Sequence, residues 1–96
     1  MIVWVIYDIK DDKTRSTIAK RCKQAGLYRV QYSVFLGSLS ANEKDTLVLQ
    51  LESLIDEADD SVYVLPMSKS QLNQSALLGQ AFDQELVTDE VNQLFL

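Results

Sequence analysis

The sequence contains no histidine, and this absence excludes several kinds of active site at once. Without imidazole there is no Ser-His-Asp or Cys-His nucleophile system and no histidine-ligated zinc. Hydrolysis by this chain would have to depend on carboxylates, a hard cation such as magnesium, tyrosine, lysine or arginine. Most classes of hydrolase are therefore excluded.

Cysteine and long apolar runs are also scarce. The single cysteine, Cys22, excludes an internal disulfide and a cysteine-based zinc cluster. No apolar run approaches the roughly 20 residues that a membrane helix needs, and the apolar start is too short for a cleaved signal. A chain of 96 residues with 47% hydrophobic and 24% charged residues is expected to fold as one domain, residues 1–96, in the cytoplasm.

The charge is unevenly distributed along the chain. The net charge is −5, yet residues 1–37 carry seven basic and three acidic side chains, or +4, whereas residues 38–96 carry two basic and eleven acidic ones, or −9. We therefore expect one basic surface suited to phosphate and one acidic surface that keeps the protein soluble or docks a basic partner.

The first ten residues, MIVWVIYDIK, predict the central strand of the fold. Both parities are apolar, which is typical of a strand buried on both faces. The apolar run stops at Asp8. A carboxylate at the end of a buried strand is a candidate functional group, and a turn former or helix cap is the alternative.

A basic helix is predicted from about Asp12 to Ala25. Asp11 or Asp12 can cap its start, and Gly26 follows its end. The apolar stripe includes Cys22, which we interpret as a small core residue. The other positions carry a basic cluster that is either a solvated face or a footprint for a phosphate backbone: Lys13, Arg15, Lys20, Arg21 and Lys23.

The segment Leu27–Gly37, LYRVQYSVFLG, alternates as a half-buried strand does. As a single strand it places Phe35 on the open face beside Arg29, where the ring either stacks on a base or partner ring or covers a neighbouring helix. The length also permits two short strands with a bend near Gln31–Ser33, and no turn-forming residue decides between them.

Ser40 and Glu43 form a capping box ahead of a second helix, predicted to run to about Ala58, and Val62–Leu65 is a short strand stopped by Pro66. This order of elements indicates an α+β, ferredoxin-like βαββαβ fold with an antiparallel sheet and a core of about residues 1–66. Helices on one sheet face leave the other face to be covered, most simply by a second copy in a homodimer.

The remainder, residues 67–96, is predicted as a loop to Ser75 and an extra edge strand over Ala76–Phe82 that pairs with another chain. Asp83–Leu96 is either a short amphipathic element, a tail that orders on a partner, or a terminus without a role.

These segments together resemble the CRISPR-associated Cas2 family. The likeness is carried by VIYDI at Val5–Ile9, the basic helix, RVQYSVFLGSL at Arg29–Leu39 and the closing AFDQELVTDEVNQLF. The resemblance implies a ferredoxin-like homodimer that acts in spacer acquisition, bridges dimers of the CRISPR-associated integrase and holds double-stranded DNA by its backbone. It also implies metal-dependent endonuclease activity, on single-stranded RNA in some members and double-stranded DNA in others.

By position, the resemblance makes Asp8 the metal-binding carboxylate and Tyr7 the residue before it. Arg15, Arg29 and Phe35 match positions tied to activity or substrate contact. Thr17 departs from the family, since many members have a second helix arginine there, and Lys20 and Arg21 are the residues that would compensate.

One aspartate alone is a poor magnesium site, because Mg²⁺ usually takes one or two carboxylates with waters and phosphate oxygens. A two-fold axis near the strand end would join two Asp8 side chains, while Arg15 and Arg29 hold phosphate with forked donors. Tyr7 either orients water or belongs to the core. Three functions stay open: a non-catalytic adaptor, a magnesium-dependent phosphodiesterase, and a non-catalytic regulatory module for a small ligand.

Overall fold

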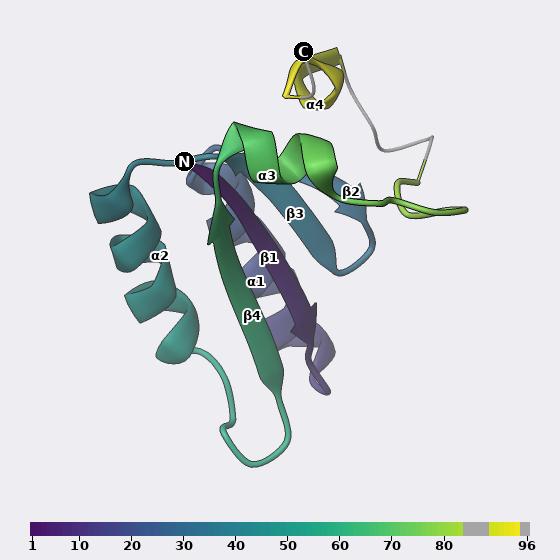
Figure 1. Cartoon of the computed structure of the whole chain (residues 1–96). Helices are drawn as coiled ribbons and strands as arrows, with labels where there is room; N and C mark the ends of the chain where they lie inside the picture. Colours follow the sequence, from purple (N-terminus) through teal and green to yellow (C-terminus); the bar gives the residue numbers. More distant parts are fainter. Residues whose placement is uncertain (84–88, 95–96) are drawn as a thin grey trace.

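The computed structural model describes residues 1–83 and 89–94 and shows a four-stranded sheet with two long helices (Figure 1). The elements are, in chain order, β1 Ile2–Asp8, α1 Asp12–Gln24, β2 Tyr28–Gln31, β3 Val34–Ser38, α2 Ala41–Glu52, β4 Ser61–Met67, α3 Lys69–Gln74 and α4 Asp89–Gln93. Within the described residues, no helix is long and apolar enough to cross a membrane.

The sheet has the order β2-β3-β1-β4 and is antiparallel throughout. β1 lies in the interior, with Val5 opposite Phe35 on β3 and opposite Val64 on β4. This order of strands and helices confirms the predicted α+β, ferredoxin-like class. The apolar character of β1 on both parities follows from its place between two strands and two layers.

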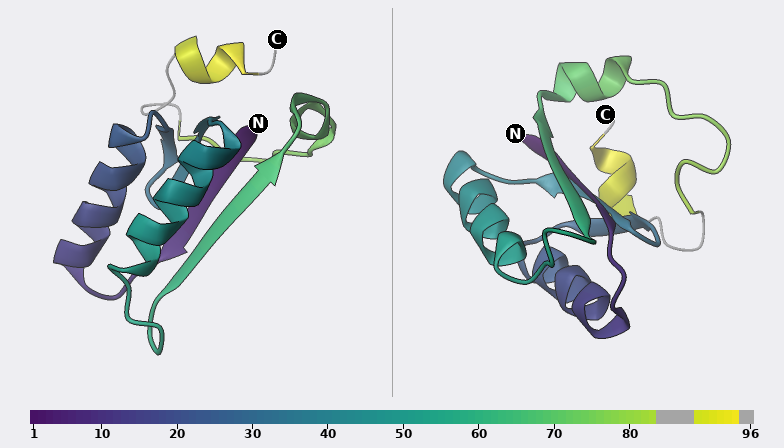
Figure 2. Two further views of the ribbon diagram at one scale, coloured as in Figure 1. Left: turned by 90° about the vertical axis from the view of Figure 1, so that its left-hand side faces the viewer. Right: turned by 90° about the horizontal axis from the view of Figure 1, so that it is seen from below.

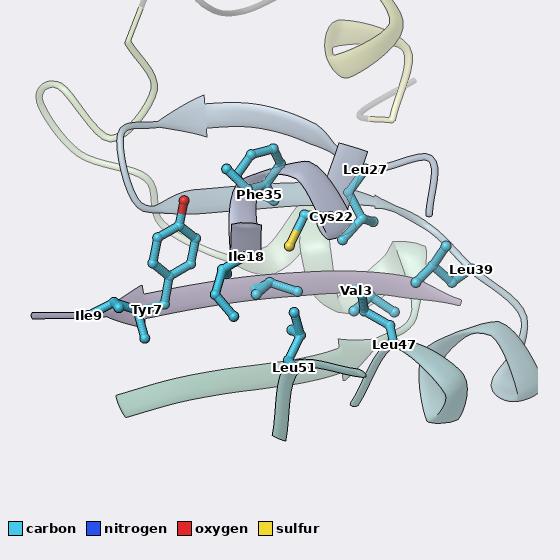
Figure 3. Packing of buried hydrophobic residues seen from close by; sticks show 12 residues of the cluster. Val3, Tyr7, Ile9, Ile18, Cys22, Leu27, Phe35, Leu39, Leu47 and Leu51 are labelled. Atoms are coloured by element: carbon cyan, nitrogen blue, oxygen red, sulfur yellow. The ribbon is translucent and has the colours of Figure 1, made fainter. Parts of the chain in front are cut away.

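Both long helices cover one face of the sheet (Figure 2). The odd residues of β1 point toward them and form the main core with buried side chains of both helices (Figure 3). Cys22 is fully buried there, as predicted, and burial raises the pKa of its thiol to about 12. The thiol is therefore protonated and inert at neutral pH.

The opposite face carries a second, smaller apolar cluster. Ile2 and Trp4 of β1 pack there with Leu36, with Leu72 of α3 and with Val91 of α4. The Trp4 ring also contacts Phe82, with centroids 6.1 Å apart. Part of the face that was expected to await a second copy is thus covered by α3, Phe82 and α4 of the same chain.

Two boundaries differ from the sequence-based prediction. α2 ends at Glu52, not at Ala58, because the Asp60 carboxylate accepts the backbone N–H groups of Asp56, at 2.9 Å, and of Lys10, at 3.0 Å. β4 continues through Pro66 to Met67, because β4 is an edge strand and proline's missing N–H faces away from the ladder.

Two predictions for residues 67–82 are wrong. The expected loop contains α3, which begins with a capping box between Ser68 and Gln71. No strand forms over Ala76–Phe82, where Gly79 has a φ of 62° that breaks an extended run. The end of this segment instead lies beside β2, because the backbone N–H of Asp83 donates to the Val30 carbonyl at 2.7 Å.

The end of the chain is the short helix α4, with Val91 buried in the second cluster. This agrees with a short amphipathic element. Leu86, Val87 and Phe95, which contributed to that prediction, lie outside the described residues.

Candidate nucleic-acid interface

The segment Leu27–Gly37 forms two strands, which corrects the expected position of Phe35. A turn at Tyr32-Ser33 separates β2 from β3, and the register shifts between Arg29 and Gln31. The irregularity breaks the alternation that a single strand would have. Phe35 lies opposite Val5 of β1, on the sheet face that the helices cover, so it is fully buried in the main core, and the interpretation of it as an open-face ring is wrong.

The ring of Phe35 contacts two other planar groups, the Tyr7 ring and the Arg29 guanidinium. On one side it stacks with Tyr7, with centroids 6.3 Å apart and planes at 19° (Figure 3). The Arg29 guanidinium lies over the ring, with Cζ 5.0 Å from the centroid. The Tyr32 ring is the next neighbour of the guanidinium, at 5.8 Å from Cζ. Both distances are within the range of cation–π attraction.

Arg29 is half-buried and incompletely satisfied. Its Nε is buried without a hydrogen-bond partner, and no carboxylate in residues 1–83 or 90–94 forms an ion pair with it. Taking a charged group out of water without an acceptor is costly. Arg29 therefore lines the cavity without an anionic partner among these carboxylates.

Arg15 is held in place by the start of α1. Asp11 caps the helix by accepting from the Thr14 backbone N–H at 2.8 Å and from its hydroxyl at 2.9 Å, and these bonds lower the pKa of Asp11. One turn later, Arg15 Nη1 donates to the Ile9 carbonyl at 3.1 Å and Nη2 pairs with Asp12. Asp12 therefore neutralises part of the charge of Arg15.

Tyr7 is a buried member of the site. Its hydroxyl donates to the Tyr32 carbonyl at 3.4 Å. Burial raises the pKa of Tyr7, and the nearby charges of Arg29 and Arg15 oppose that effect. Tyr7 therefore stays protonated at neutral pH and acts as a core residue and hydrogen-bond donor, not as a base.

These side chains line one cavity of about 300 Å³. The structure brings together three of the predicted residues, Tyr7, Arg15 and Arg29, with Phe35 beneath Arg29. The lining also contains three residues that were not predicted as site residues, Asp12, Ser16 and Tyr32. Only the turn at Tyr32-Ser33 could have revealed Tyr32, and that turn contains no glycine, proline or asparagine.

Asp8 lies apart from this cavity. Successive residues of a strand point to opposite faces, so Asp8 shares the face of Trp4 while Tyr7 enters the main core. The Asp8 side chain is 78% exposed and lies 3.9 Å from Lys10 Nζ, a pair that contributes little in water. Across residues 1–83 and 90–94, no three Asp, Glu or Cys side chains are grouped to hold a metal.

The predicted basic cluster of α1 divides among different surfaces. Lys13 and Lys20 are exposed and lie seven residues apart, hence on one outward face. Arg21 lines a separate groove beside α2 and donates to Gln24 at 3.1 Å. Thr17 is uncharged, and its hydroxyl donates to the Lys13 carbonyl at 3.0 Å. Of the helix cations, only Arg15 joins Arg29.

Comparison with known proteins gives consistent matches. Residues 1–75 match the family described as CRISPR associated protein Cas2. A protein of Archaeoglobus fulgidus named CRISPR-associated endoribonuclease Cas2 1 is 37% identical over 67 residues, which cover 70% of this chain and 71% of that protein. The CRISPR-associated endoribonuclease Cas2 of Desulforudis audaxviator is 35% identical over 71 residues, covering 74% and 67% of the two chains.

Solved structures agree with this result. The crystal structure of Streptococcus pyogenes Cas2 superposes with a TM-score of 0.67 at 31% identity, covering 82% of this chain and all of that one. A hypothetical protein of Thermus thermophilus superposes with a TM-score of 0.62 at 32% identity, covering 70% and 80%.

Proposed function

The chain belongs to the CRISPR-associated Cas2 family, and from this premise we propose that it is a nucleic-acid-binding adaptor of spacer acquisition. In this role the protein holds the sugar–phosphate backbone and bridges dimers of the CRISPR-associated integrase. The proposal extends to double-stranded DNA and to single-stranded RNA, because both present the same phosphate chemistry.

The observation that carries the proposal is the unpaired charge of Arg29 beside Arg15 in one cavity. A phosphate in the cavity would supply an anionic partner for the half-buried Arg29 guanidinium, which forms no ion pair with a carboxylate in residues 1–83 or 90–94, and a guanidinium fork matches phosphate geometry. Ser16 would add a neutral hydroxyl at the rim. Lys13 and Lys20 would extend the positive potential along the exposed face of α1.

We further propose that the protein works as a homodimer joined through the sheet face that carries Asp8. That face exposes Tyr63 and Leu65 by 56% and 43%, and each lies opposite an apolar residue of β1, Ile6 and Trp4. A second copy would remove this apolar surface from water. The same contact would bring two Asp8 side chains toward one axis.

The second candidate function is a magnesium-dependent endonuclease centred on Asp8. It is favoured by the name of the relatives, endoribonuclease, and by an exposed carboxylate at the end of a buried strand. One carboxylate per chain falls short of a usual magnesium site, so the residues fit the ion only as a pair of Asp8 in a dimer. When bound, magnesium would activate water and offset charge at phosphorus.

The substitution Asp8→Ala separates the two candidates. If the protein is an adaptor, this variant still binds duplex DNA and supports spacer acquisition in cells. If catalysis is required, acquisition is lost together with metal-dependent cleavage of RNA or DNA. Ser61→Ala, opposite Asp8 on β4, is the matched control, because it alters the same strand end without removing a carboxylate.

The integrase contact is tested by co-purification with and without the residues after Ala81. We expect removal of this acidic, partly apolar segment to weaken the assembly. Because Phe82 and Val91 pack on the Trp4 cluster, the truncated protein must also show cooperative unfolding for the result to count. Unchanged assembly rejects a role for the tail.

The third function, a regulatory module for a small ligand, predicts no salt-sensitive affinity for nucleic acid. Binding through phosphates weakens steeply between low and moderate salt. A titration of a labelled duplex at two salt concentrations therefore distinguishes the adaptor from this module.

A further inference from the structure

An exposed aromatic ring stands beside the phosphate-binding arginines, and it is Tyr32. Tyr32 is 78% exposed and lies at the turn between β2 and β3. The sequence had offered Phe35 for contact with a base, but Phe35 is fully buried. Tyr32 therefore supplies the free π-face that Phe35 lacks.

The position of Tyr32 is fixed by the fold, although its side chain is exposed. Its backbone carbonyl accepts the Tyr7 hydroxyl at 3.4 Å, which anchors the turn to the buried end of β1. The Arg29 guanidinium lies 5.8 Å from the ring centroid, and both residues line the same cavity. Little side-chain freedom remains to be lost on binding, because tyrosine has only two rotatable bonds.

The other exposed tyrosines lack this setting. Tyr28 and Tyr63 lie opposite Leu36 and Ile6, on the sheet face that points away from the cavity. In the part of the chain that the structure describes, Tyr32 is thus the only exposed tyrosine that lines the arginine cavity.

We propose that Tyr32 stacks on the base of an unpaired nucleotide whose phosphate is held by Arg15 and Arg29. This inference rests on the proposed function and adds a residue that contacts the base. Phosphate and base of one nucleotide are joined by a single sugar, so one nucleotide reaches both the arginines and the ring. Stacking tolerates any sequence, because every base has a π-face.

The proposal carries a preference for strand state. Inside a duplex both faces of each base are covered by neighbouring pairs, so the Tyr32 ring finds no partner there. Single strands and single-stranded ends present free bases. The cavity therefore binds the backbone of either form, while Tyr32 adds affinity only for unpaired nucleotides.

The test measures binding of a labelled single-stranded RNA and of a blunt duplex of equal length by fluorescence anisotropy. The proteins are wild type, Tyr32→Ala, Tyr32→Phe and the control Tyr28→Ala. We expect Tyr32→Ala to weaken binding of the single strand by about 5- to 100-fold. Tyr32→Phe, which keeps the ring face, and Tyr28→Ala are expected to remain within about twofold, as is duplex binding by every variant.

A 2-aminopurine base placed in the single strand reports stacking directly, because its fluorescence is quenched when an aromatic ring covers it. Quenching by wild type and Tyr32→Phe, lost in Tyr32→Ala, supports the proposal. Equal weakening of duplex and single strand by Tyr32→Ala, or no weakening, overturns the stacking role alone. If wild type binds neither nucleic acid, the proposed function itself fails, and the stacking role fails with it.

Discussion

The Arg29 guanidinium lies over the ring of the buried Phe35, with Cζ 5.0 Å from the ring centroid. The contact joins the main core to the cavity, because Phe35 belongs to the core and Arg29 lines the cavity wall. The apolar ring orients the charge without neutralising it, unlike a carboxylate. The core therefore positions Arg29, and its guanidinium can still bind an anionic ligand.

Replacing Phe35 tests this double role. Phe35→Ala is expected to destabilise the protein by about 3–5 kcal/mol, as for other buried aromatic residues. Phe35→Leu keeps most of the apolar volume, so we expect a smaller loss of stability but weaker nucleic-acid binding. Chemical denaturation and anisotropy titrations measure the two effects. Full binding affinity in folded Phe35→Leu would show that the ring does not orient Arg29.

Gly37 is predicted to tolerate no side chain. A Cβ placed there would lie 2.7 Å from Leu27 Cδ2 and 3.2 Å from Leu27 Cα. The shorter contact is with the end of the buried Leu27 side chain, which would have to move within the packed core, and the backbone contact would remain tight after that movement. Gly37→Ala should lower the free energy of unfolding by about 1–3 kcal/mol, measured by denaturant titration. Gly79→Ala, where a Cβ meets no atom within 4 Å, controls for loss of glycine, although its positive φ adds local strain.

Stability should fall in acid through Asp60. Its pKa is lowered from 3.8, chiefly because its carboxylate accepts backbone N–H groups from Lys10 and Asp56. A lowered folded-state pKa gives stability that is present above pH 3.8 and is lost as the pH falls through the lowered value. We expect Asp60→Ala to be less stable at neutral pH and to lose less stability on acidification. Parallel pH-dependence in both proteins would contradict this role of Asp60.

The elements with local signals were predictable from the sequence. The two-sided apolar run of β1, the Asp11 cap of α1 and the Ser40–Glu43 capping box each act through neighbouring residues, and the structure confirms them. Ser68 and Gln71 carry the same kind of signal, but residues 67–75 are predicted above as a loop, so α3 is missed although a local signal for it exists.

The arrangement of the site was not predictable in the same way. Phe35 is in the core because β3 pairs with β1, which places Phe35 opposite Val5 on the helix-covered face, and this pairing joins strands distant in sequence. Sequence resemblance indicated Tyr7, Arg15, Arg29 and Phe35 but not how they are grouped. The separation of Asp8 from the arginines follows from strand parity, once β1 is placed between its two neighbours.

The most direct test of the central claim, that Arg29 holds a nucleic-acid phosphate, is the salt dependence of binding. The affinity of wild type and Arg29→Gln for a labelled single strand is measured across a range of salt concentrations. Lys44→Gln, which removes an equal charge from α2 away from the cavity, is the control. If Arg29 contacts a phosphate, the slope of log affinity against log salt becomes shallower by about 0.7 in Arg29→Gln and not in Lys44→Gln. An unchanged slope and affinity in Arg29→Gln would contradict the claim.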